Sequence, residues 1–275
     1  MKTLVTADWL QQRLHDPNLI ILDASVATNA HGQAFETFDR TIPKARKFDL
    51  KGVFRDLEAP YPNTVPRPED FERECRKLGI GQNSEIVVFD HNGIYTSARV
   101  WWLFQIMGHA NIAVLDGGLP QWIAQDRPTE KTPMTDFAMG DFKARFQADQ
   151  VVSFKQVDTN TNSQKFLIVD ARSKGRFSGT EAEPRKSLQS GHIPHSINLP
   201  FKEVLQDGRF KTKAELLALF APSRAEGKEV VFSCGSGMTA CILALANTVA
   251  DGSSLKVFDG SWSEWAERKQ LYTRD

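Results

Sequence analysis

The chain has 275 residues, of which 41% are hydrophobic and 25% charged, and its 34 basic residues balance its 34 acidic ones. This length predicts two domains, and the zero net charge argues against a global field that would recruit nucleic acid or an anionic membrane. Because three scattered cysteines cannot form a disulfide framework and no apolar run is long enough to span a bilayer, we expect a cytoplasmic protein.

Taken in chain order, four motifs of the first half return in the second half. IILDAS (20–25), TIPKARKFDL (41–50), EIVVFD (85–90) and VLDGGLPQW (114–122) return as LIVDAR (167–172), HIPHSINLPF (192–201), EVVFSC (229–234) and VFDGSWSEW (257–265). The offsets between the paired motifs are 147, 151, 144 and 143 residues. Such regular spacing predicts two homologous domains rather than a short-period solenoid.

Short apolar runs alternate with helical patterns in each half. This alternation predicts an α/β fold of two tandem domains, each a mainly parallel sheet flanked by helices. We expect an N-terminal domain at 1–128 and a C-terminal domain at 151–275. Residues 129–150, which contain scattered charges and little periodicity, are the predicted linker.

Cys234 follows the apolar run 229–233 and precedes two glycines, Gly235 and Gly237. Since residues 238–250 have the length and content of a helix, Cys234 is predicted to lie at a strand-to-helix turn. Backbone N–H groups and a helix N-terminus converge at such a turn and favour an anionic sulfur. A cysteine is often only a small buried apolar residue, but the two glycines favour a nucleophile here.

The two copies differ at this position, because Asp90 stands in the first copy where Cys234 stands in the second. Only the C-terminal domain can therefore carry a cysteine nucleophile, and the N-terminal domain is expected to be catalytically inactive. We expect the first domain either to cover the site or to be a purely structural duplicate.

Over essentially its whole length the chain resembles the two-domain rhodanese-type sulfurtransferases. Its loop CGSGMT, 234–239, is similar to the CG-S/T-G-V-T loop of the 3-mercaptopyruvate branch, whereas the thiosulfate branch tends to have CRKGVT. The resemblance implies that Cys234 carries sulfur as a persulfide. The persulfide loop would consist of Gly235, Ser236, Gly237, Met238 and Thr239.

A second motif, GRFSGTEAEPR at 175–185, resembles the family segment GRF-x-GTEPEPR. The resemblance implies that Arg176 and Arg185 bind the carboxylate and carbonyl end of 3-mercaptopyruvate. Guanidinium groups suit this role because they form planar, charge-assisted hydrogen bonds, although loop arginines are more often solvated surface charges. The thiosulfate branch commonly has an acid where Arg185 stands.

The implied reaction moves sulfur from 3-mercaptopyruvate to a thiol such as thioredoxin or a small dithiol, or to cyanide, and releases pyruvate. It implies no cofactor and no metal. Ser236 and Thr239 would donate hydrogen bonds to the sulfur, although Thr239 could instead cap the following helix. Lys51 and Asn63 stand where several relatives have the acid and the histidine of a proton relay, so we expect no relay of that kind.

Alternative functions differ in what the sequence offers them. A thiosulfate sulfurtransferase and a non-catalytic rhodanese-fold binding module both stay open. Gly235, Gly237 and Ala240 match a dinucleotide-binding pattern, but only 16 residues follow Asp259, which is too few to complete a doubly wound sheet. A phosphatase would need an arginine where Ala240 stands.

Overall fold

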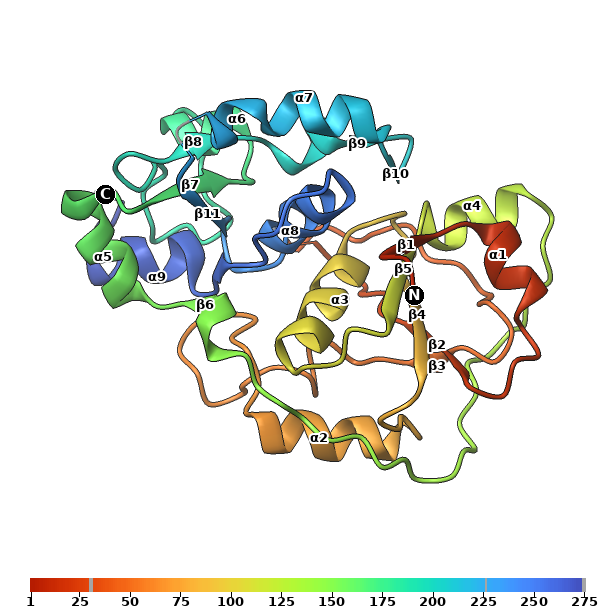
Figure 1. Cartoon of the computed structure of the whole chain (residues 1–275). Coiled ribbons are helices and arrows are strands. Elements are labelled where there is room, and N and C mark those ends of the chain that lie inside the picture. The colour runs from red at the N-terminus through yellow and green to blue at the C-terminus, as the bar shows by residue number, and fades with distance from the viewer. Residues whose placement is uncertain (30–31, 226, 274–275) are drawn as a thin grey trace. The chain divides into compact units, whose positions relative to one another are not determined.

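The computed structural model describes residues 1–29, 32–225 and 227–273 (Figure 1). Its contacts divide the chain into two compact units. The first unit comprises Met1–Leu57, Val65–Gln147 and Asp207–Phe210, and the second comprises Glu58–Thr64, Ala148–Gln206 and Lys211–Asp275. Each unit contains a five-stranded sheet in which every pairing is parallel.

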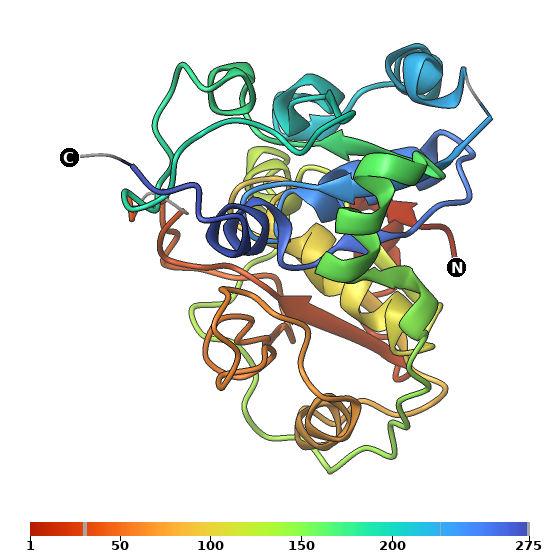
Figure 2. The same cartoon turned by 90° about the vertical axis from the view of Figure 1, so that its left-hand side faces the viewer.

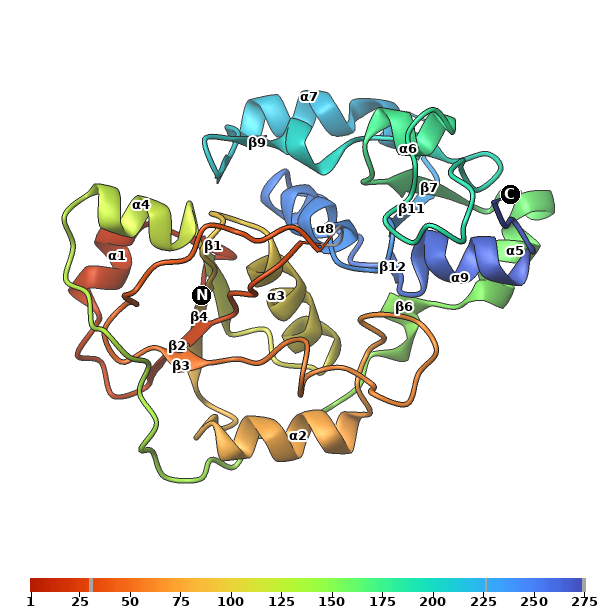
Figure 3. The ribbon, with the colours of Figure 1, turned by 180° about the vertical axis from the view of Figure 1, so that it is seen from behind.

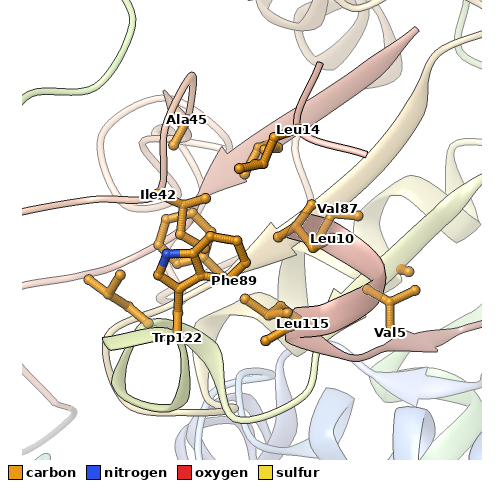
Figure 4. Close-up of a cluster of buried hydrophobic side chains, with 13 residues drawn as sticks. Val5, Leu10, Leu14, Ile42, Ala45, Val87, Phe89, Leu115 and Trp122 are labelled. Atoms are coloured by element: carbon orange, nitrogen blue, oxygen red, sulfur yellow. The ribbon is translucent and has the colours of Figure 1, made fainter. Parts of the chain in front are cut away.

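The sheet of the first unit has the strand order β1-β5-β4-β2-β3. Its elements are β1 (Leu4–Val5), α1 (Ala7–Gln12), β2 (Leu19–Asp23), β3 (Arg46–Lys47), α2 (Pro68–Lys77), β4 (Glu85–Phe89), α3 (Thr96–Ile106), β5 (Ile112–Leu115) and α4 (Gly118–Ala124). Helices α1 and α4 lie side by side in Figure 1 and again from behind in Figure 3. They cover one face of the sheet, where Leu10 of α1 and Trp122 of α4 pack with Val87 and Phe89 (Figure 4).

The sheet of the second unit has the strand order β6-β12-β11-β7-β8. The corresponding strands of the two copies therefore lie in the same order in both sheets. Its strands are β6 (Val151–Val152), β7 (Phe166–Asp170), β8 (Ile197–Asn198), β11 (Glu229–Ser233) and β12 (Val257–Phe258). Its helices are α5 (Phe154–Ser163), α6 (Lys174–Ser178), α7 (Lys213–Arg224), α8 (Ala240–Val249) and α9 (Ser261–Arg268). The remaining elements are the 3-10 turns η1 (Ala148–Gln150) and η2 (Phe201–Val204), the short strand β9 (Leu205–Gln206) and, in the first unit, the short strand β10 (Arg209–Phe210).

Helices cover both faces of the second sheet. Helices α5 and α9, green and dark blue in Figure 2, join one apolar cluster in which Val157 and Trp265 pack with Val231 of β11. Helix α8 packs on β11 and β12 and is almost wholly buried. The predicted fold, two α/β domains with parallel sheets flanked by helices, is therefore confirmed.

Helix α8 begins at Ala240 and ends at Val249, inside the predicted range 238–250. Among the described residues, no helix is both long and apolar enough to cross a membrane.

Candidate functional site

Cys234 is the first residue after β11 and is 1% exposed. Strand β11 lies between β7 and β12, and its residues Val230, Val231 and Phe232 are buried, so packing fixes the point at which the strand ends. The loop that follows turns at Gly237, whose φ of +77° is a left-handed value that favours glycine. Residues 234–239 therefore connect a buried strand to the buried helix α8, as the sequence predicted.

The side chain of Ser261 holds this loop through hydrogen bonds to its backbone. Its Oγ accepts hydrogen bonds from the backbone N–H groups of Cys234 and Gly237, at 3.1 and 3.2 Å, and donates one to the carbonyl of Phe258 at 2.8 Å. The same oxygen lies 3.9 Å from the Cys234 sulfur. Ser261 is fully buried and was missed in the sequence analysis, although aligning the two copies pairs it with Gly118 and exposes the change.

The first turn of α9 also binds the loop. The backbone N–H groups of Trp262 and Ser263 donate to the carbonyls of Cys234 and Gly235, at 2.9 and 3.0 Å. The Ser263 hydroxyl donates to the Gly235 carbonyl as well, at 2.7 Å. Helix α9 thus anchors the backbone on both sides of the Cys234–Gly235 peptide.

Asn63 contacts the other end of the loop. Its side-chain Nδ2 donates to both the carbonyl and the Oγ of Ser236, each at 3.0 Å. Asn63 belongs to the segment 58–64 of the second unit, far from the loop in sequence. Lys51 belongs to the first unit, where its Nζ donates to the carbonyl of Thr28 at 3.0 Å.

Arg176 lies directly against the loop. It is part of α6, which begins after Ser173, and its side chain is 13% exposed. A Cβ placed on Gly235 would lie 2.6 Å from Nη2 of Arg176, so only a glycine leaves room for the guanidinium there. The structure therefore brings Cys234, Gly235 and Arg176 together.

A buried set of charges holds Arg176. Glu183 accepts from Arg176 through Nε at 3.1 Å and Nη2 at 2.6 Å, and from Arg172 through Nη1 at 2.8 Å. Arg172 in turn pairs with Asp170 at the end of β7, at 2.6 Å, and its guanidinium lies 4.5 Å from the ring centroid of Trp262. Burial lowers the pKa of Arg172, but the two carboxylates outweigh this effect, so its pKa lies above the ordinary value.

Arg185 has a different environment. Its side chain is 42% exposed and pairs with Glu267 of α9 at 3.1 Å. Among the contacts of the described residues, this ion pair is the one that involves its guanidinium, and none reaches the loop. The structure thus brings one of the two predicted arginines to the cysteine loop.

Met238 and Thr239 complete the loop. Met238 is buried, with 6% exposure. Thr239 occupies the N-cap position of α8, and within the described residues its side chain makes no capping hydrogen bond. The alternative that Thr239 serves as a helix cap is therefore not supported.

The corresponding loop of the first unit shows what this backbone shape can bind. The buried carboxylate of Asp90 accepts hydrogen bonds from the N–H groups of Asn92, Tyr95 and Ser97, all at 2.8 Å. Asp90 occupies the place of Cys234, and Asn92 and Tyr95 occupy the places of Ser236 and Thr239. In the first unit the backbone amides of this loop thus surround an anionic group, the side chain of Asp90.

Other potential chemistry is sparse in the described part of the chain. Cys75, Cys234 and Cys241 are buried, and none of them forms a disulfide within the described residues. Burial, together with Glu74, raises the pKa of Cys75 well above its ordinary value. Within the described residues, no group of three His, Cys, Asp or Glu side chains is arranged to hold a metal ion.

Comparisons with known proteins agree with the fold. The rhodanese-like domain model matches residues 6–125 and 153–268. The chain is 35% identical to the 3-mercaptopyruvate sulfurtransferase of Escherichia coli K12, over 97% of this chain and 96% of the relative. It is 34% identical to the thiosulfate sulfurtransferase of Rattus norvegicus, over 99% and 95%. The crystal structure of SseA, a 3-mercaptopyruvate sulfotransferase from Escherichia coli, superposes with a TM-score of 0.84 at 32% identity, covering 95% of this chain and 99% of SseA.

Proposed function

The chain belongs to the rhodanese-type sulfurtransferases, and on that premise we propose that it transfers sulfur from 3-mercaptopyruvate through a persulfide on Cys234. The acceptor would be a thiol such as thioredoxin or a small dithiol, or cyanide. In this proposal residues 1–128 are a catalytically inactive domain, 129–150 a linker and 151–275 the catalytic domain.

The contact between Arg176 and Gly235 is the observation that supports this donor most directly. Nη2 of Arg176 lies 2.6 Å from the position of a Cβ on Gly235, the residue that follows the nucleophile. A small 2-oxo acid bound by Arg176 would therefore hold its sulfur within reach of Cys234. The arginine of a CRKGVT loop would occupy the same space as this guanidinium, which supports 3-mercaptopyruvate over thiosulfate.

The reaction balances without an added oxidant or reductant. The Cys234 thiolate forms an S–S bond to the substrate sulfur, the C–S bond breaks, and its electron pair becomes the enolate of pyruvate. The proton of the transferred SH group then protonates the enolate carbon, which gives pyruvate and a persulfide anion. In the second half-reaction an acceptor thiolate or cyanide binds the outer sulfur, and Cys234 leaves as a thiolate.

The loop supplies the environment for the persulfide anion. The loop that holds the Asp90 carboxylate in the first unit does so with the amides that correspond to those of Ser236 and Thr239. We assign these two amides to the outer sulfur, because preorganised N–H groups stabilise an anion without reorganisation. Gly237 and Met238 then shape the loop and take no part in the chemistry.

Arg185 is proposed to bind the carbonyl end of the donor after it leaves Glu267. Both partners of that ion pair are well exposed, at 42% and 36%, and such pairs contribute only about 0–1 kcal/mol. Exchanging Glu267 for a substrate oxygen therefore costs little. Asn63 cannot carry a proton as a histidine would. The reaction described above needs no proton relay, because the enolate takes its proton from the transferred SH group.

Thiosulfate is the second candidate donor, because the chain is similar to a thiosulfate sulfurtransferase at nearly the same identity. The test measures pyruvate release from 3-mercaptopyruvate and thiocyanate formation from thiosulfate, with wild type and Cys234→Ser. We expect Cys234-dependent turnover that favours 3-mercaptopyruvate in kcat/KM. Higher kcat/KM with thiosulfate would contradict the donor assignment, and no turnover of either donor would favour a binding module.

A further inference from the structure

We propose that Ser263 is a positioning residue of the persulfide loop, because its two hydrogen bonds to Gly235 fix the direction of the Ser236 N–H group. This inference rests on the proposed function, which assigns the Ser236 amide to the outer sulfur. The role of Ser263 is indirect. It holds the loop in the shape that an anionic sulfur needs before any sulfur is transferred.

The geometry of one peptide group supports this role. The carbonyl of Gly235 accepts from the Ser263 N–H at 3.0 Å and from the Ser263 hydroxyl at 2.7 Å. The Gly235 carbonyl and the Ser236 N–H belong to the same planar trans peptide and therefore point in opposite directions. Since both donors lie in the first turn of α9, the Ser236 N–H points away from α9.

The N–H group of Ser236 is placed to bind an anion. Within the described residues it donates no hydrogen bond, although Ser236 accepts from Asn63 through both its carbonyl and its hydroxyl. The corresponding N–H in the first unit, that of Asn92, donates to the Asp90 carboxylate at 2.8 Å. A backbone N–H without a partner, at a position whose repeat binds an oxygen anion, favours an anionic ligand.

The two copies of the repeat differ at the position of Ser263. The first copy has Pro120 there, and proline has neither an N–H nor a hydroxyl to donate. The preceding residue keeps its contact in both copies, since the N–H groups of Leu119 and Trp262 donate to corresponding carbonyls, at 3.0 and 2.9 Å. The double hydrogen bond of Ser263 is thus confined to the copy that contains the cysteine.

A carboxylate within the loop explains why the first copy can do without these two bonds. The Asp90 side chain is part of the loop and itself orients the N–H groups that surround it. Cys234 has no carboxylate, so other contacts must orient its loop before sulfur arrives. Fixed N–H groups stabilise a developing anion without reorganisation, and Ser263 provides this for the Ser236 amide.

The test compares three variants of the full-length protein. Ser263→Ala removes the hydroxyl bond. Ser263→Pro removes both bonds and gives α9 a proline at its third residue, where α4 also has one. Ser254→Ala is the matched control, because the Ser254 hydroxyl also donates to a carbonyl of β11, that of Val230, near the opposite end of the strand.

Two reactions are measured for each protein. The first is pyruvate release from 3-mercaptopyruvate in a single turnover, which gives the maximal rate and the donor concentration at half that rate. The second is the partition of sulfur between Cys234 and glutathione, read by mass spectrometry after mixing with glutathione persulfide. In that exchange the Cys234 thiolate forms an S–S bond to the outer sulfur, the original S–S bond breaks, and glutathione leaves as a thiolate.

We expect Ser263→Ala to lower the maximal rate and the equilibrium constant for sulfur uptake by Cys234 about threefold, and Ser263→Pro to lower both about tenfold or more. The half-saturating donor concentration should stay within about twofold of wild type, because the contacts of Arg176 are unchanged. Ser254→Ala should match wild type in all three quantities.

Wild-type partition in both Ser263 variants, an equal change in Ser254→Ala, or a change confined to the half-saturating donor concentration would overturn the inference. Ser263→Ala keeps the backbone hydrogen bond, so its result decides the matter if Ser263→Pro lacks a normal circular-dichroism spectrum. Glutathione persulfide bypasses the donor site, so the partition separates failure of this inference from failure of the proposed donor.

Discussion

Gly235→Ala perturbs the contact on which the donor assignment depends. The new Cβ would lie 2.6 Å from Nη2 of Arg176, whereas ordinary contacts begin at 3.4 Å. The guanidinium must therefore move by roughly 1 Å, against the ion pair that Glu183 holds at 2.6 Å. Displacing a substrate-positioning group by about this distance can lower the rate on the order of 10²-fold.

We expect Gly235→Ala to lower kcat/KM for 3-mercaptopyruvate by about 10- to 100-fold, or about 1.4–2.7 kcal/mol of transition-state stabilisation. Pyruvate release under steady-state conditions measures the effect. The variant should fold normally, because Gly235 is only partly buried and does not have a left-handed φ. Gly81→Ala is the matched control, since its Cβ would lie equally close, at 2.6 Å, to Oδ1 of Asp141 in the first unit. That control should retain wild-type turnover.

A double-mutant cycle decides whether the loss acts through Arg176. If it does, Gly235→Ala should have little further effect in an Arg176→Ala background, so the two single losses must not add. Fully additive losses, or a Gly235→Ala enzyme with undiminished kcat/KM, would refute the proposed link between the arginine and the loop.

Three further results are expected. Ser261→Ala removes a buried oxygen that accepts hydrogen bonds from the N–H groups of Cys234 and Gly237, so it should lower the free energy of unfolding by roughly 1–3 kcal/mol in urea titrations. Ser233→Ala, whose buried hydroxyl has no partner among the described residues, should be nearly neutral, and equal losses would contradict the loop-support role of Ser261. Asn63→Ala should lower kcat about 3- to 10-fold, because the Asn63 amide orients Ser236 through a hydrogen bond. The pH profile of kcat should stay the same, since an amide does not titrate. A shifted pH profile would argue for proton transfer at this position. Cys75 should resist alkylation until the protein unfolds, because burial excludes the reagent and raises the pKa of the thiol. Rapid alkylation of Cys75 in the native protein, detected by mass spectrometry, would disprove this.

Repetition made much of the fold predictable. Apolar runs such as 20–22 and 167–169 precede an aspartate in both copies, and parallel sheets place such ends along one edge. The position of Cys234 followed from the same pattern, because a buried strand that meets two glycines must turn there. The strand order within each sheet carries no local signal and required the structure.

Several site residues could not be predicted from sequence because their roles depend on contacts between distant segments. Ser261 accepts from residues 24 and 27 positions away, and Asn63 reaches Ser236 across 173 positions. Glu183 lies inside the motif that identified the two arginines, yet its pairing with Arg172 becomes visible only when β7 and the following loop are folded. The exposure of Arg185 likewise depends on the position of Glu267 on α9. The domain boundaries and the cytoplasmic location stay predictions.

The central claim is that Cys234 carries the transferred sulfur, and peptide mapping by mass spectrometry tests it most directly. The enzyme is mixed with 3-mercaptopyruvate in the absence of any acceptor, and its peptides are then mapped. We predict that the peptide with Cys234 gains one sulfur atom, that the gain disappears on addition of cyanide or a dithiol, and that Cys234→Ser shows no gain. An unmodified Cys234 peptide in an enzyme that still releases pyruvate would contradict the account.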